Sequence, residues 1–269
     1  MSIKKLSDES QYIGIVERYR RPGCLSNDYL QTRAEGLIAR GRLEALCFDD
    51  NAYLLEHKDG FCRLYYYLND LEANDKPRFQ GDVMTEILYR GALSYPDAEV
   101  AFLERMGFER NLVRDQYAAV YRDLASAGSY AEVSVRPAHD LDEVQWACLM
   151  FNAMFDRYSG DFISEESYGD LLSADSILMA VDNKGNRVGA LHQTIERNVA
   201  WISHVAVVPA VRGHHVGVAL VDAFVERNHV NDKSRYMLWV QRHNTAAVAM
   251  YEKKGFKNLG KSTLSLIRK

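Results

Sequence analysis

The feature that most constrains this chain is an apolar, strand-like segment that passes through a short loop into a helix-forming segment, within residues 205–220. A helix N-terminus has backbone N–H groups without intrahelical partners, and its dipole is positive there, so it binds phosphate without needing a particular side chain. Arg212 adds a fixed positive charge beside Gly213, and Gly217 permits close approach to the backbone. The segment therefore predicts a diphosphate site.

A second pattern follows a strand-like segment at residues 236–240. It has the form Asn-x-x-Ala-x-x-x-Tyr-x-x-x-Gly-Phe and is carried by Asn244, Ala247, Tyr251, Gly255 and Phe256. Asparagine is a common helix N-cap, and a tyrosine two turns later lies on the same helix face as the alanine. The pattern predicts a helix whose small residue lets a ligand lie along it.

Together and in this order, the two segments resemble the GNAT superfamily of acyl-CoA-dependent N-acyltransferases. The pyrophosphate signature of that family is Arg or Gln, two residues, Gly, one residue, then Gly or Ala. Arg212 and Gly217 match its ends, whereas His215 stands where the first glycine is expected. A helical residue still presents its N–H when it carries a side chain, so the backbone contacts of the signature remain available.

The resemblance implies acetyl-CoA as co-substrate, no metal, and a role for each matching residue. Tyr251 would protonate the departing thiolate, since a phenol (pKa ~10) can donate to a thiol (pKa ~8.5) with modest tuning. The alternative for Tyr251 is a ring packed in the core with a satisfied hydroxyl. The backbone of Val205 and Val207 would pair with the peptide-like pantetheine arm. The expected coenzyme A contacts are Val205, Val207, Arg212, Gly213, His214, His215, Val216, Gly217, Val218, Asn244 and Tyr251.

The sequence leaves open which group deprotonates the acceptor amine. Regular alternation in strand 200–208 would put Ile202, His204 and Ala206 on one face and Trp201, Ser203, Val205 and Val207 on the other. No carboxylate lies within that strand, so the candidates are His204, His192, Glu196 and a chain of water molecules. A single histidine in an apolar strand is also typical of a satisfied core residue. The candidate catalytic residues are therefore Tyr251, His204 and Glu196.

Composition excludes several other classes of protein. The 269 residues are 47% hydrophobic and 26% charged, which is typical of a globular protein, and the net charge of −4 gives no indication of nucleic acid or an anionic membrane as partner. The N-terminus is too polar for a signal peptide, and the four cysteines form no Cys-x-x-Cys pair. We therefore expect free thiols, no metal site and a cytoplasmic monomer or homodimer.

An internal similarity predicts the domain organisation. Residues 101–108 parallel residues 249–256, since each segment is a short helix ending at Gly, followed by Phe and a strand. In the first copy Pro96, Glu99 and Leu103 replace Asn244, Ala247 and Tyr251. A glycine C-cap before a core aromatic also arises without duplication. We predict an α/β fold of two GNAT-like halves, each a mostly antiparallel mixed sheet flanked by helices. The degenerate half would span 1–123, the linker 124–130 and the acetyltransferase domain 131–269.

The leading hypothesis is an acetyl-CoA-dependent N-acetyltransferase acting on an amine of a small molecule or peptide. Two alternatives remain at this stage. One is a transferase that uses a longer acyl group or a thiol or hydroxyl acceptor. The other is a non-catalytic coenzyme A-binding regulatory module, which His215 favours and Tyr251 disfavours, because binding alone needs no acid near the thiol.

Overall fold

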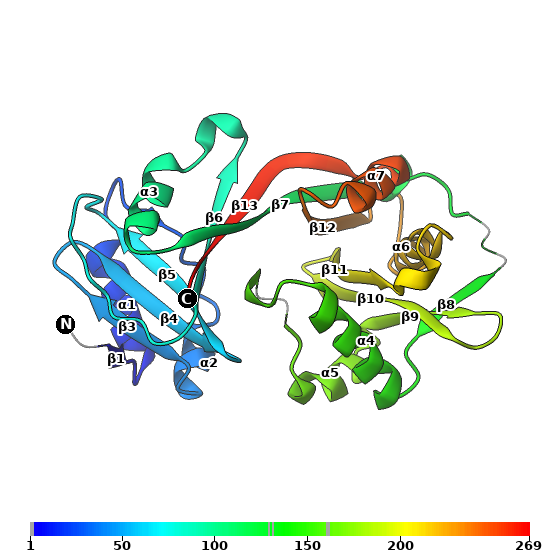
Figure 1. Ribbon diagram of the computed structural model, residues 1–269, viewed down its shortest axis with the longest axis horizontal. Coiled ribbons are helices and arrows are strands. Elements are labelled where there is room, and N and C mark those ends of the chain that lie inside the picture. The colour runs from blue at the N-terminus through cyan, green and yellow to red at the C-terminus, as the bar shows by residue number, and fades with distance from the viewer. Residues whose placement is uncertain (1–2, 129, 131, 160–161) are drawn as a thin grey trace. The chain divides into compact units, whose positions relative to one another are not determined.

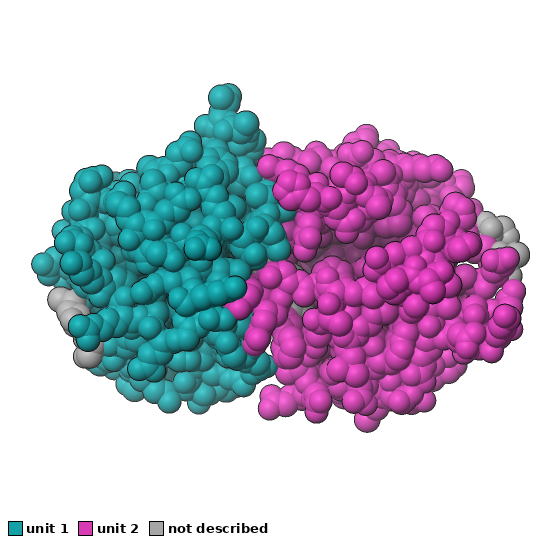
Figure 2. Space-filling model, in the orientation of Figure 1, with its two compact units in different colours: residues 1–113, 262–269 teal, residues 114–261 magenta. Residues whose placement is uncertain are grey.

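The computed structural model describes residues 3–128, 130, 132–159 and 162–269. The chain forms two compact units, one of residues 1–113 with 262–269 and the other of residues 114–261 (Figure 2). The predicted domains, 1–123 and 131–269 with a linker at 124–130, stay a prediction; the compact units divide the chain within β7, and the last eight residues group with the N-terminal unit. Ser129 and Ala131, in the predicted linker and at the predicted domain start, lie outside the described residues.

The N-terminal unit is a mixed sheet with helices on both faces (Figure 1). Its strand order is β1-β3-β4-β5-β6-β13-β7, in which β5 and β6 run parallel and β2 also pairs with β5. Its elements are β1 (Lys4–Lys5), α1 (Glu9–Tyr19), β2 (Leu25–Ser26), α2 (Ala34–Ala39), β3 (Leu43–Cys47), β4 (Ala52–Lys58), β5 (Phe61–Leu68), β6 (Val83–Arg90), α3 (Asp97–Arg105), and parts of β7 (Glu109–Val120) and β13 (Lys257–Arg268).

Two apolar clusters fill the N-terminal unit, one on each face of its sheet. Alternation along β5 sends Leu64 and Tyr66 into the cluster under α3, and Tyr65 and Tyr67 into the cluster under α1 and α2. Leu103, the residue at the position of Tyr251 in the internal similarity, is fully buried in the α3 cluster. A leucine there packs the core and offers no proton.

The second unit has the strand order β7-β12-β11-β10-β9-β8. Helices α6 and α7 cover the cluster on one face of the sheet, and α4 and α5 cover the cluster on the other. This arrangement confirms the predicted fold class of a mostly antiparallel mixed sheet flanked by helices. Its further elements are β8 (Val133–Pro137), α4 (Leu141–Met154), α5 (Tyr168–Ser173), β9 (Ile177–Asp182), β10 (Arg187–Glu196), β11 (Val199–Val207), α6 (Val216–Arg227), β12 (Arg235–Gln241) and α7 (Thr245–Lys254).

Strands β11 and β12 separate part-way along their length. They pair in parallel from Val199 with Arg235 to Ile202 with Leu238, and the pairing ends there. Beyond that point β11 remains paired with β10 as far as Val207, and β12 remains paired with β7 as far as Gln241. Both strands are therefore held from their outer sides while their facing edges diverge.

A β-bulge at the point of divergence changes which residues share a face. His192 pairs with His204 and the next residue of β10, Gln193, pairs with Ile202, so Ser203 is an extra residue on β11. Ile202 and Val205 both pack in the cluster under α6, whereas Ala206 packs under α4. The prediction that Ile202 shares a face with His204 and Ala206 is therefore wrong, because it assumed uninterrupted alternation.

A buried ion pair joins the two helices that flank this opening. Lys254 at the end of α7 pairs with Asp222 in the middle of α6, and both side chains are about 5% exposed (6% and 5%). Asp222 also accepts hydrogen bonds from the Tyr130 hydroxyl (2.7 Å) and the Gly128 N–H (3.0 Å). The Lys254 Nζ donates to the Ser126 carbonyl (3.1 Å). The pair thus fixes α6, α7 and the segment before β8 to one another.

Two observations concern the described residues as a whole. No described helix combines the length and apolar character required to cross a bilayer. Within the same residues, no cluster of three or more His, Cys, Asp or Glu side chains is arranged to hold a metal ion, and the four cysteines are free thiols.

We expect Lys254→Met to lower the free energy of unfolding by about 3–5 kcal/mol, because it leaves the buried Asp222 carboxylate without its counter-charge. Arg227→Met is the matched control, since Arg227 forms a largely exposed pair with Asp175 and should cost less than about 1 kcal/mol. Urea unfolding measures both. Equal losses in the two variants would mean that the buried pair contributes no more than the exposed one.

Candidate functional site

The second unit contains a cavity of about 820 Å³ at the divergence of β11 and β12. Figure 2 shows the drawn face of this unit hollowed. The end of α4, the start of α6 and one side of α7 complete the cavity wall. Predicted site residues that line the cavity are Glu196, Val205, Val207, Arg212, Gly213, His215, Val216, Gly217, Val218, Asn244 and Tyr251. His204 and His214 do not belong to the lining.

The edge of β11 that faces the cavity consists of backbone rather than reactive side chains. From His204 to Val207 the strand pairs only with β10 in the described part of the sheet, so no strand covers its other edge, where the Val207 carbonyl accepts from Arg212 Nε. Val205 and Val207 pack their side chains against the cluster under α6. An extended, amide-containing ligand can pair with such an edge in the way that another strand would.

The start of α6 presents backbone donors to the same cavity. The first hydrogen bond of the helix runs from the Ala219 N–H to the His215 carbonyl (2.9 Å), so the N–H groups of Val216, Gly217 and Val218 precede the helical ladder. Arg212 lies beside them, with its Nε 3.3 Å from the Val207 carbonyl oxygen. This combination of a helix N-terminus and a guanidinium fits a diphosphate.

The backbone conformation of His215 shows how the loop accommodates a histidine where the family signature has a glycine. Its backbone is left-handed, with φ 62° and ψ 8°, and it is the N-cap of α6. Glycine adopts this region without strain, and histidine adopts it more readily than most other residues do. The loop therefore keeps the conformation that a glycine would give it, at the expense of some backbone strain.

Gly217 has room for a side chain as far as the protein itself is concerned. A Cβ at this position would lie 3.4 Å from the Met250 sulfur and 3.7 Å from Val207 Cγ2, which are ordinary contacts. Packing within the protein therefore does not require a glycine here, and the absence of a side chain leaves this turn of α6 accessible from the cavity.

Tyr251 lies at the inner wall of the cavity. Its side chain is 6% exposed, and its ring meets Phe256 edge-on with centroids 5.7 Å apart. Its hydroxyl has no hydrogen-bond partner among the residues that the structure describes, and burial alone raises the pKa of this phenol above its usual value. Tyr251 therefore stays protonated at neutral pH and faces the cavity as a donor.

Asn244 holds the start of α7. Its Oδ1 accepts a hydrogen bond from the Ala247 N–H (3.2 Å), as expected for an N-cap, and Gly255 ends the helix with φ 106°. Asn244 and Ala247 both line the cavity. The motif thus sets both ends of the helix that carries Tyr251.

The fold places the three candidate bases, His204, His192 and Glu196, in different surroundings. His204 is 4% exposed and stacks on Phe151 (centroids 5.0 Å apart) beneath α4, and its Nδ1 lies 3.1 Å from that of His192. Neither histidine lines the cavity, whereas the exposed Glu196 does. The bulge at Ser203 causes this division, because it turns His204 toward α4.

Sequence reasoning missed several lining residues that carry no motif. They come from β10, β11, β12, β7 and the end of α4, and they are Thr194, Trp201, Ser203, Trp239, Gln241, Arg114, Met154 and Phe155. A signal was present in the alternation of β12, where Trp239 lies between the core residues Leu238 and Val240. The sequence located this strand at residues 236–240 but did not show which of its faces borders the cavity.

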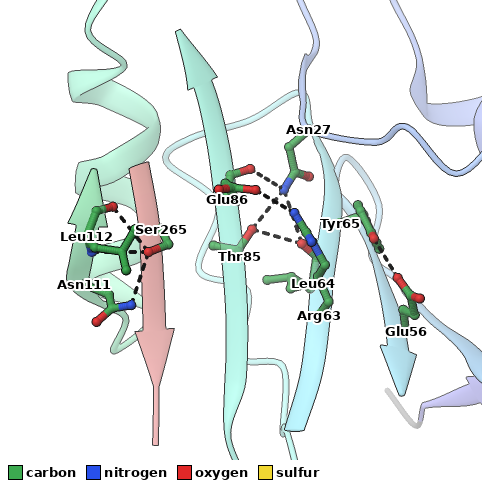
Figure 3. A network of polar contacts seen from close by, with 10 residues as sticks. All are labelled: Asn27, Glu56, Arg63, Leu64, Tyr65, Thr85, Glu86, Asn111, Leu112 and Ser265. Carbon is green, nitrogen blue, oxygen red and sulfur yellow. Dashed lines mark hydrogen bonds and ion pairs between the residues drawn. The ribbon is translucent and has the colours of Figure 1, made fainter. Parts of the chain in front are cut away.

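The N-terminal unit has a similar divergence, and its own chain fills it (Figure 3). Strands β5 and β6 pair only from Cys62 with Val83 to Leu64 with Thr85. The Asn27 amide nitrogen then lies 3.2 Å from the Leu64 carbonyl, 2.9 Å from Thr85 Oγ1 and 3.1 Å from the Glu86 carbonyl. Strand β2, just before Asn27, pairs with the far end of β5. The backbone edge that is open in β11 is therefore occupied in β5.

Residues 139–256 match the acetyltransferase (GNAT) family. This part of the chain is a GNAT domain. The same fold occurs in a GCN5-related N-acetyltransferase from Sphaerobacter thermophilus, with 14% identity, a TM-score of 0.59, and coverage of 81% of this chain and 76% of that one. No curated protein matches the chain.

Two further solved structures resemble nearly the whole chain. A tandem GNAT protein from the clavulanic acid biosynthesis pathway has 10% identity and a TM-score of 0.57, over 99% of this chain and 97% of its own. A GNAT-family acetyltransferase from Colwellia psychrerythraea has 11% identity and a TM-score of 0.57, over 100% of both chains. At these identities the likeness shows the fold, which is that of a tandem GNAT protein.

We expect His215→Gly to leave affinity for acetyl-CoA, the co-substrate that the family resemblance implies, within about threefold. It should shift the free energy of unfolding by no more than about 1 kcal/mol, because relief of strain offsets the added freedom of the unfolded chain. His214→Gly is the control, since His214 has no positive φ and its replacement relieves nothing. Calorimetric titration and urea unfolding measure both quantities. A tenfold loss of affinity in His215→Gly alone would mean that the imidazole itself binds the ligand.

Proposed function

We propose that this protein transfers the acetyl group of acetyl-CoA to an amine of a small molecule or peptide. The observation that carries the proposal is the open edge of β11 beside the unpartnered hydroxyl of Tyr251, in a cavity that also contains the start of α6. A thioester on an extended, amide-containing arm that ends in a diphosphate has the chemistry to match these three features.

In this proposal each element handles one part of the co-substrate, which supplies the acetyl group as a thioester. Arg212 and the N–H groups of Val216, Gly217 and Val218 bind the diphosphate, with Gly213, His214 and His215 shaping the loop. The open backbone of Val205 and Val207 binds the pantetheine amides. Asn244 and Ala247 allow the arm to lie along α7 toward Tyr251.

The reaction requires two proton movements. The acceptor nitrogen forms a bond to the acyl carbon as the carbon–sulfur bond breaks, and Tyr251 gives its hydroxyl proton to the departing sulfur. The nitrogen loses a proton to Glu196 or to water in the open cavity, and solvent returns a proton to Tyr251. His204 takes no part, because it is buried beneath α4 outside the cavity lining.

The N-terminal unit acts as a scaffold in this proposal. Asn27 and β2 occupy the strand opening that would receive a pantetheine arm, and Leu103 replaces the tyrosine. We therefore expect one molecule of acetyl-CoA to bind per chain, and we expect it to bind in the second unit.

Arg212→Glu tests this assignment. The charge reversal should weaken acetyl-CoA binding at least tenfold, because it turns attraction for the diphosphate into repulsion. Arg227→Glu makes the same charge change at the other end of α6 and should leave affinity within about threefold. Calorimetric titration gives affinity and stoichiometry together. Equal affinities in the two variants, or two sites per chain, would contradict the proposal.

Tyr251→Phe tests the chemistry. Removing the hydroxyl should lower kcat by about 10²-fold and leave acetyl-CoA affinity nearly unchanged, because a general acid contributes in the transition state rather than in binding. Release of the coenzyme A thiol in steady-state assays measures turnover, and calorimetry measures binding. Unchanged turnover would remove Tyr251 from the mechanism.

A further inference from the structure

Two tryptophans occupy one face of the sheet at the mouth of the strand divergence. Trp239 alternates with Leu238 and Val240, which pack under α6, so its side chain lies on the opposite face. Trp201 likewise alternates with Ala200 and Ile202 of the same cluster. Both tryptophans are half-buried and both line the cavity.

The register places both side chains where the strands begin to separate. Trp201 pairs with Met237, and Trp239 lies two residues further along β12 on the same face, one residue past the last paired position, Leu238. Both indoles therefore border the opening, one from each of the diverging strands.

Polar residues on the same face mark where the rest of such a ligand would lie. Thr194 pairs with Trp201 across β10 and β11, and its hydroxyl oxygen lies 3.5 Å from that of Ser203, the bulge residue beside the open edge. Glu196 follows two residues later on the same face and is exposed. Of the described residues that line the cavity, Glu196 supplies the carboxylate, whereas Arg114 and Arg212 are cationic.

We propose that the acceptor is a small monoamine with an aromatic ring, a substrate class that rests on the transferase function proposed above. The ring contacts Trp201 and Trp239, and the amine projects past Ser203 toward the open edge of β11. Glu196 attracts the cationic form of the amine from solvent.

The ring contact distinguishes aromatic acceptors from others of similar size. Aromatic pairs prefer offset-stacked or edge-to-face geometries and gain stabilisation beyond their buried area, which a saturated ring does not. The preference of the site among acceptors should therefore depend on the aromaticity of the acceptor as well as on its volume. One side of the Trp239 indole already contacts a cation, since the Lys261 Nζ lies 5.9 Å from the ring centroid.

The test compares 2-phenylethylamine with its saturated match 2-cyclohexylethylamine, and with glucosamine and spermidine, at saturating acetyl-CoA. We expect kcat/KM to be about tenfold higher for the aromatic amine than for the cyclohexyl one. Trp239→Leu and Trp201→Leu should each reduce that ratio toward one, mainly through KM. Faster turnover of glucosamine or spermidine, or a ratio that neither variant changes, would overturn the aromatic assignment.

A binding measurement keeps this inference separate from the proposed function. Two of the three tryptophans of the chain line the cavity, so 2-phenylethylamine should quench the fluorescence of the protein loaded with coenzyme A, and should do so less in Trp239→Leu. Quenching without turnover supports the acceptor site and counts against the transferase chemistry. Coenzyme A binding without any quenching overturns the inference and leaves the cofactor assignment standing.

Discussion

The separation of β11 from β12 is the constraint on which the rest of the site depends. Strand backbones carry donors and acceptors that are costly to leave unpaired, so two adjacent strands separate only if each is held elsewhere. Here β10 holds β11 and β7 holds β12 beyond the point where their mutual pairing stops. The open edge is thus enforced by the sheet around it, and it presents backbone groups to the cavity without relying on particular side chains.

The two units differ in whether their own chain fills the gap between the diverging strands. Both contain a parallel strand pair that diverges after a few residues. In the N-terminal unit, the Asn27 side chain and β2 satisfy the freed groups of β5, so the opening contributes to stability instead of binding. In the GNAT domain the corresponding groups face a cavity. The same backbone geometry therefore serves as scaffold in one unit and as candidate site in the other.

The sequence predicted the parts of the site that depend on local chemistry. The loop around Arg212, the Asn244 cap and the Gly255 helix end follow from short-range rules that do not need the tertiary structure. The bulge at Ser203 could not be predicted in this way, because an extra residue is defined only by the register of the neighbouring strand. Uninterrupted alternation groups Ile202 with His204 and Ala206, whereas the structure keeps His204 and Ala206 together under α4 and puts Ile202 under α6. The division into compact units within β7 likewise depends on where distant segments pack, which the local sequence does not contain.

Burial shifts the pKa values of the acid and of the leaving group in the proposed reaction in the same direction. It raises the pKa of the Tyr251 phenol, which by itself would make the proton harder to give up. A thiolate released beside Tyr251 would also lose solvent, so burial shifts the pKa of the thiol in the same direction as that of the phenol. The acceptor amine differs, because the carboxylate nearest to its proposed position, Glu196, is exposed. In the proposed transfer, burial therefore acts on the acid and the leaving group together, while the amine loses its proton on the solvent-exposed side of the site.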